Sequence, residues 1–231
     1  MRFKLLIKAS VLMLVLSTFV FGQDLFIRKA VIDFPGSEPG GTGNIVSGLD
    51  LDKDGKVEFY AVNDNWGDTP DEMIPRIYKY ENNGGTWELV WMTALNIPKQ
   101  NTWPALTYGD LDKDGKGEII WGIVNNTDDA NPNPARIVVF ETVGDGSDAM
   151  GIADGSGNYL PNAKWTILPS TSVKENMRPF MWEVKDIDDD GVDEIIFADR
   201  AGATSTFQIG VISVNNIPDN GDGSETWSLE F

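Results

Sequence analysis

One acidic motif occurs three times in this chain, and it limits the possible folds more than any other feature. Its first, third and fifth residues are aspartate, its sixth is glycine and its ninth is glutamate, and an apolar run follows. The copies span residues 50–58, 110–118 and 186–194, so their starts are 60 and 76 residues apart. Such self-similarity indicates a repeat protein, in which each repeat is one supersecondary unit.

Short runs of β-branched and aromatic residues flank each copy, with Gly, Asn, Asp and Pro between them, which is typical of strands and turns. One run precedes each acidic loop and three follow it, the last with Trp as its second residue. The predicted strands are residues 44–51, 57–64, 76–81 and 86–92, then 103–111, 118–125, 136–142 and 164–170, then 179–187, 194–199, 207–214 and 226–231. No stretch after the N-terminal segment has a helical period.

Four short antiparallel strands per repeat are the composition of one blade of a β-propeller, so we predict an all-β fold. The acidic loops would join the first and second strands of each blade. The predicted divisions are a signal peptide at 1–22, a leading strand segment at 23–35, and blades at 36–97, 98–171 and 172–231. In the middle blade, residues 143–163 form a Gly-, Asp- and Ser-rich insertion, which we expect to be a mobile surface loop.

Three blades do not close a ring, because propellers typically have about four to eight. We therefore expect a partial propeller, whose open faces meet the remaining blades of a longer parent chain. Pairing with a second copy of the chain is the alternative. Either arrangement would cover strand edges that otherwise invite association.

The N-terminal segment predicts export. Arg2, Lys4 and Lys8 precede an apolar run from Ala9 to Phe21, which is typical of a secretory signal cleaved after about Gly22. An uncleaved membrane anchor is the alternative, but the run is short for a spanning helix. We expect a secreted or cell-surface protein with no membrane insertion after cleavage.

Charge and composition exclude several function classes. The formal net charge is −18, and it becomes −21 if the three basic residues of the signal are removed. Such a charge argues against nucleic acid and anionic membranes as partners. The chain has neither cysteine nor histidine. Disulfides, zinc sites built from these residues and histidine-dependent catalytic triads are thereby excluded.

The acidic motif itself predicts a cation site. Alternating carboxylates can turn toward one point in a tight loop, and glycine permits the sharp bend. Their mutual repulsion is on the order of a few kcal/mol per pair at an effective dielectric of about 20, and a divalent cation removes it. Calcium suits such a site because it accepts about six to eight oxygens in flexible geometry. We predict about one calcium ion per acidic loop, with a solvated acidic turn as the alternative.

The predicted ligands are the carboxylates at positions one, three, five and nine and the backbone carbonyl at position seven. They are Asp50, Asp52, Asp54, Lys56 and Glu58; Asp110, Asp112, Asp114, Lys116 and Glu118; and Asp186, Asp188, Asp190, Val192 and Glu194. An EF-hand also requires an acid at position twelve and flanking helices. Position twelve is Ala61, Trp121 or Phe197 here, so that module is rejected.

The motif D-x-D-x-D-G-x-x-E before apolar strands resembles the calcium loop of FG-GAP/VCBS-type repeats, the family that includes the integrin α-subunit propeller. The ninth residue is Glu where that family more often has Asp, and the Phe-Gly and Gly-Ala-Pro signatures are not evident. These departures favour the VCBS-like bacterial branch. The resemblance implies recognition or adhesion through a protein or glycan partner.

Two other functions stay open at this point. The propeller could be the scaffold of a secreted polysaccharide lyase or glycoside hydrolase, or a passive repeat domain of a larger secreted protein. Nearly every clustered carboxylate belongs to an acidic loop, and no leftover acid pair or Lys/Tyr constellation recurs outside the blades. The sequence therefore favours a non-catalytic role, and no catalytic residue is assigned.

Overall fold

The computed structural model describes residues 30–35, 41–64, 74–97, 104–123, 132–168, 177–199 and 208–230. The chain divides into two compact units, Met1–Asp33 and Phe34–Phe231. The predicted signal peptide lies outside the described residues. Of the predicted leading strand, only residues 30–35 are described, and they form no strand. No helix within the described ranges is long and apolar enough to cross a membrane.

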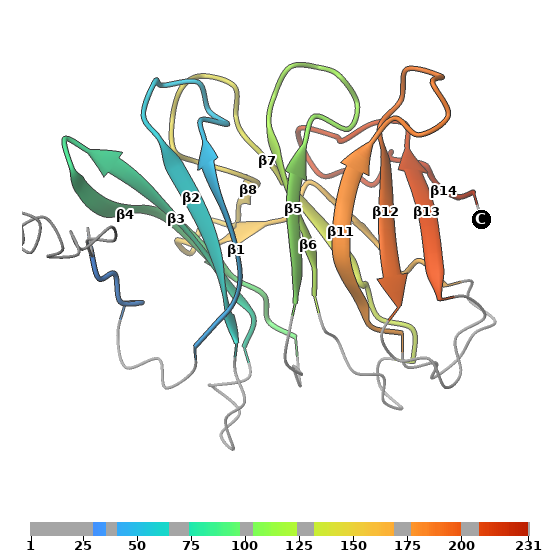
Figure 1. Ribbon diagram of the computed structural model, residues 1–231, viewed down its shortest axis with the longest axis horizontal. Coiled ribbons are helices and arrows are strands. Elements are labelled where there is room, and N and C mark those ends of the chain that lie inside the picture. The colour runs from blue at the N-terminus through green and yellow to red at the C-terminus, as the bar shows by residue number, and fades with distance from the viewer. Residues whose placement is uncertain are drawn as a thin grey trace, which may run out of the picture. The chain divides into compact units, whose positions relative to one another are not determined.

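The second unit contains three four-stranded antiparallel sheets, each with its strands in simple neighbour order (Figure 1). The first sheet comprises β1 (Gly41–Leu49), β2 (Glu58–Asp64), β3 (Arg76–Asn83) and β4 (Thr86–Ala94). The second comprises β5 (Ala105–Gly109), β6 (Glu118–Gly122), β7 (Ile137–Glu141) and β10 (Ala163–Trp165). The third comprises β11 (Pro179–Lys185), β12 (Glu194–Asp199), β13 (Ile209–Val214) and β14 (Trp227–Leu229). The all-β prediction is confirmed, and the sheets are consistent with propeller blades.

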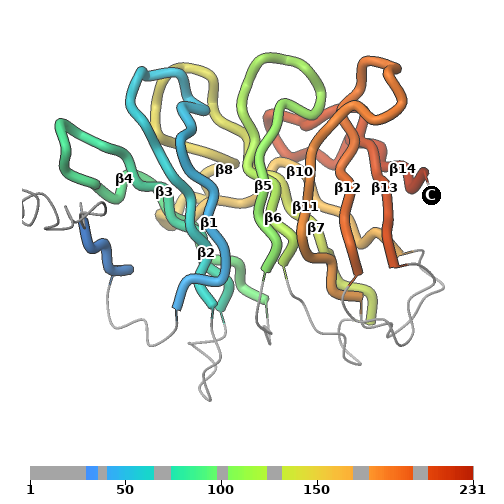
Figure 2. Tube along the Cα trace, in the orientation of Figure 1, coloured from blue at the N-terminus to red at the C-terminus, as the bar shows by residue number. Residues whose placement is uncertain are grey.

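The acidic loops join the first and second strands of each sheet, as predicted, and Figure 2 shows all three at the same end of the sheets. The glycine at position six has a φ of 89° to 95° in every copy, a conformation that favours glycine. The residue at position four also has a positive φ, between 60° and 62°. These residues are Lys53, Lys113 and Asp189. The three loops therefore share the same two left-handed backbone positions.

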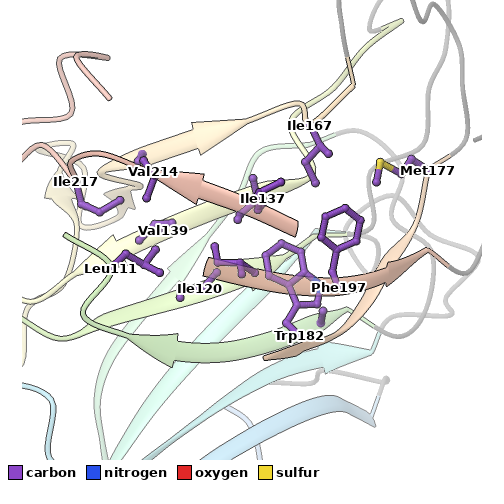
Figure 3. Close-up of a cluster of buried hydrophobic side chains, with 14 of the residues drawn as sticks. Leu111, Ile120, Ile137, Val139, Ile167, Met177, Trp182, Phe197, Val214 and Ile217 are labelled. Carbon is purple, nitrogen blue, oxygen red and sulfur yellow. The ribbon is translucent and has the colours of Figure 1, made fainter. Parts of the chain in front are cut away.

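Apolar side chains fill the space between neighbouring sheets. Ile120 and Val139 of the second sheet belong to the same buried cluster as Trp182 and Phe197 of the third (Figure 3). A second cluster joins the first and second sheets and includes Trp121, which is fully buried. This interdigitation holds the acidic loops of adjacent sheets beside one another.

The tryptophans at the start of each fourth strand pack in two different ways. Trp165 and Trp227 stack across the second and third sheets, with ring centroids 5.6 Å apart and an interplanar angle of 7°. Trp87 instead packs edge-on against Phe59 of its own sheet, at 4.9 Å. The first pair therefore packs between neighbouring sheets, whereas Trp87 packs within one sheet.

The insertion at 143–163 folds against the first sheet, which differs from the mobile surface loop expected. It contains a two-stranded sheet, β8 (Ile152–Ala153) and β9 (Tyr159–Leu160). The Asn158 side chain accepts a hydrogen bond from the Ala94 N–H and donates one to the Ala94 carbonyl, both at 2.8 Å. Thr93 also donates from its hydroxyl to the Tyr159 carbonyl at 2.7 Å. The insertion thus satisfies backbone groups of β4 that would otherwise lie on an open edge.

Candidate metal centres

Backbone N–H groups hold the carboxylates of each acidic loop in place. The aspartate at position one accepts from the N–H of position six, position three from position five, and position five from position seven. The last of these hydrogen bonds is 2.8 Å long in all three loops. Because the donors and acceptors of these hydrogen bonds lie within one loop, the local sequence sets this part of the arrangement.

The glutamate at position nine accepts a hydrogen bond from the N–H of position two in every loop. The pairs are Glu58 with Leu51, Glu118 with Leu111 and Glu194 with Ile187, and the last two bonds are each 2.9 Å long. Each of these glutamates is at most 1% exposed. This hydrogen bond joins the start of the second strand to the start of the loop, and it uses one carboxylate oxygen of the glutamate.

The structure brings the predicted carboxylates together, but in different combinations. In the second and third loops the cluster contains positions one, three and nine, with one oxygen of each residue within 4.8 Å of the others. These clusters are Asp110, Asp112 and Glu118, and Asp186, Asp188 and Glu194. In the first loop the cluster is Asp50, Asp52 and Asp54, without Glu58. The position-seven carbonyls of Lys56, Lys116 and Val192 stay a prediction.

Two further clusters contain residues that sequence reasoning missed. Asp112 and Asp114 lie near Glu141, and Asp52 lies near Glu81 and Asp148. Glu81 and Glu141 are the acids directly opposite the position-nine glutamates in the strand register. The signal available in the sequence was an acid at or next to the end of the third predicted strand in the first two repeats, whereas β13 of the third sheet contains no acid. Asp148 comes from the insertion and had no such signal.

Glu118 is the most unusual of the loop carboxylates. Its side chain is fully buried, and its second oxygen, Oε1, has no hydrogen-bond partner among the described residues. Burial raises the pKa of Glu118 to about 9, and the charges of Asp112 and Asp110 contribute to the increase. A buried carboxyl oxygen without a partner is expensive unless something satisfies it.

The third loop has a similar arrangement. Burial raises the pKa of Glu194, and the charges of Asp188 and Asp190 contribute. The Asp186 Oδ1 atom is buried without a hydrogen-bond partner in the described part of the chain. Two loops thus hold clustered, buried oxygens that a hard cation would satisfy.

Lysines at position seven neutralise the acids on the third strands. Lys116 Nζ lies 3.1 Å from Glu141 Oε2 and 2.8 Å from Asp114 Oδ2, and it also contacts Asp219. Lys56 Nζ repeats this arrangement in the first loop, 2.8 Å from Glu81 Oε2. Burial raises the pKa of Glu141 to about 8 even though Lys116 opposes the change.

The first sheet holds a second lysine beside its loop. Lys79, on β3, is fully buried, and its Nζ contacts Asp52 and lies 2.9 Å from Glu58 Oε2. It also lies 3.1 Å from Asp148 Oδ1 and 3.4 Å from Glu81 Oε1. Burial alone would lower the pKa of Lys79, but hydrogen bonds to Asp52 and Glu58 outweigh it and raise the pKa.

Lysines at position four connect neighbouring loops. Lys53 of the first loop donates from Nζ to the Gly115 carbonyl of the second. Lys113 of the second loop lies with its Nζ 2.6 Å from Asp193 Oδ2, at the end of the third. The three loops therefore form a connected row, in which each loop supports the next.

Comparison with known protein families agrees with this geometry. Residues 50–121 match the model of the FG-GAP-like repeat. No curated protein matches the chain. The matched stretch runs from the first acidic loop into β6, so it includes the first and second loops. It confirms the resemblance read from the motif over that stretch, and the third loop lies beyond it.

Proposed function

Because the chain carries an FG-GAP-like repeat with acidic clusters in its loops, we propose that it is a calcium-binding propeller-repeat domain. We infer further that it is secreted or displayed on the cell surface, where it presents loops to a protein or glycan partner. The observation that carries the proposal is Glu118, a fully buried carboxyl group beside Asp110 and Asp112, one of whose oxygens has no hydrogen-bond partner in the described part of the chain.

The donor set suits calcium. Asp110, Asp112 and Glu118 would hold an ion in the second loop, and Asp186, Asp188 and Glu194 in the third. All of these ligands are hard oxygens, whereas zinc sites favour nitrogen and sulfur. Calcium tolerates irregular oxygen cages, whereas magnesium demands a near-ideal octahedron and keeps several waters. The loop carboxylates are set by backbone hydrogen bonds, not by octahedral symmetry, which favours calcium.

The first role of the ion would be structural. It would satisfy the buried glutamate, remove repulsion within the loop and stabilise the hairpin between the first two strands. Binding to the folded form alone stabilises it by about 2.7 kcal/mol when the free ion is at about 100 times its Kd. Extracellular calcium modules commonly have Kd values of about 10⁻⁴ to 10⁻³ M, which suits an exported protein.

The recognition role has support from the arrangement of the loops. The acidic loops lie at one end of the sheets and contact one another through Lys53 and Lys113. A calcium ion in one loop would therefore order a continuous surface. The net charge of −18 favours a partner that is neutral or basic.

Calcium binding is tested by thermal unfolding and isothermal titration calorimetry of the full chain in calcium and in chelator. We expect the Tm to rise with calcium, and Asp110→Asn to bind one ion fewer. Asparagine keeps the side-chain oxygen that accepts from the Gly115 N–H, so the loop need not rearrange. The matched control is Asp189→Asn, the same substitution at the exposed position four of the third loop. A calcium-independent Tm with no measurable heat of binding would reject the proposal.

Recognition is tested separately. A glycan array and a library of displayed extracellular peptides, each probed in calcium and in chelator, should reveal a ligand whose binding requires calcium. Binding that is unchanged by chelator would place the contact away from the acidic loops.

A further inference from the structure

We propose that the three acidic loops are not equivalent, because the Lys79 ammonium group replaces a divalent cation in the first loop. Divalent ions would then bind tightly at the second and third loops and much more weakly at the first. This inference rests on the proposed calcium binding and divides that function among the loops.

The Lys79 ammonium group sits where the carboxylates of the first sheet converge. It is fully buried and lies within 3.4 Å of oxygens from four acids. These acids come from the loop, from β2, from β3 and from the insertion: Asp52, Glu58, Glu81 and Asp148. Three of them, Asp52, Glu81 and Asp148, form a cluster with the spacing of metal ligands. A positive charge already occupies that cluster.

The two carboxylate oxygens of Glu58 are both committed. Its Oε1 accepts from the Leu51 N–H, and its Oε2 forms an ion pair with Lys79 Nζ at 2.9 Å, although the geometry of that contact is not that of a regular hydrogen bond. Glu118 makes the equivalent contact with Leu111 through one oxygen only, and its other oxygen is buried with neither a hydrogen bond nor an ion pair to any described residue. The cluster of the first loop accordingly lacks its glutamate, whereas the clusters of the other two loops contain theirs.

The strand register shows that the lysine is particular to the first sheet. Lys79 pairs with Tyr60, two residues after the position-nine glutamate. At the same place the second sheet has Val139, paired with Ile120, and the third has Val211, paired with Ile196. Both valines are buried, so neither sheet can supply an ammonium group from this position.

The insertion supplies the fourth carboxylate. Asp148 precedes Met150, which is fully buried and forms a strand bridge with Thr142. The insertion is further anchored on β4 through Asn158. A residue of the second repeat thus stabilises the ammonium group of the first. A divalent ion brought beside that group would be repelled by it in a poorly screened interior.

The test is the number of calcium ions bound by the full chain in calorimetry. We expect two tight sites in the wild type and a third at least about 10-fold weaker, since like charges repel strongly at short range. Lys79→Met removes the charge and keeps an unbranched side chain, and it should convert the first loop into a third tight site. The matched control is Lys164→Met, an exposed lysine on β10, which should leave two tight sites.

A second measurement does not depend on the variant folding. Crystals of the wild type grown with terbium should show anomalous density at the second and third loops and none, or much weaker density, at the first. Three equal peaks, or three equal calorimetric sites, would overturn the inference and leave calcium binding intact. A folded Lys79→Met protein that gains no site would also overturn it. Absence of any bound ion would reject the proposed function itself.

Discussion

Replacing the buried glutamate of the second loop, Glu118→Gln, should stabilise the metal-free protein, and calcium should remove most of that advantage. Glutamine keeps the size of the side chain and an oxygen to accept from the Leu111 N–H. The substitution removes a carboxyl group whose negative charge is disfavoured by burial in the folded protein. Its amide N–H groups would face Asp110 and Asp112, which belong to the same cluster and can accept.

The expected magnitude follows from the shifted pKa. Folding raises the pKa of Glu118 from an ordinary 4.5 to about 9, so at pH 7 the folded state must take up a proton. At about 1.4 kcal/mol per unit, the 2.5 units between 4.5 and pH 7 correspond to about 3 kcal/mol of lost stability. Glu118→Gln should therefore stabilise the metal-free protein at pH 7, by up to about 3 kcal/mol.

Calcium should cancel most of this difference. The wild type would gain about 2.7 kcal/mol from each of the second and third loops when free calcium is at about 100 times the Kd, whereas the variant loses the second loop's share. Urea unfolding followed by circular dichroism, in chelator and in excess calcium, measures both states. Glu183→Gln, at an exposed position on β11, is the matched control and should change neither. If Glu118→Gln destabilises the metal-free protein, the argument from the raised pKa is wrong. If the variant keeps the full calcium gain, the buried carboxyl group is not a ligand.

Two further predictions concern acid–base behaviour and the insertion. Since the folded state binds the Glu118 proton more tightly, its contribution to stability is complete below pH 4.5 and is lost as the pH rises toward about 9. The free energy of unfolding of the metal-free protein, and with it the Tm, should therefore fall between pH 5.5 and 8.5. This group contributes a slope of at most about 1.4 kcal/mol per pH unit to the free energy of unfolding, and calcium should flatten the profile. A metal-free Tm that rises over this range would contradict it. Asn158→Ala removes three hydrogen bonds to Ala94 and Thr93 and should destabilise the protein by about 1–3 kcal/mol. It should also speed proteolysis within 143–163, whereas Ser156→Ala, exposed in the same segment, should not.

The local features of this protein were predictable from its sequence. Strand β12 was predicted with both of its observed ends, residues 194 and 199, because acidic residues bound a short run of β-branched and aromatic residues there. The predicted strand at 164–170 ends early at Trp165, since Ile167 adopts a positive φ of 65° that periodicity does not reveal. The aspartates of each loop point inward through hydrogen bonds between residues two to five apart, so spacing alone specified them.

The partners of those aspartates depend on contacts that spacing does not specify. Lys79 looked like one polar residue in a strand, and it became the shared partner of four carboxylates only when strand register placed it beside Glu58. Asp148 arrives from the next repeat, 69 residues away. Local sequence therefore determined that each repeat builds a hairpin with an acidic loop. The tertiary structure decided which loop has its carboxylates neutralised by a buried lysine, because charge interactions depend on distance in space and not on separation along the chain.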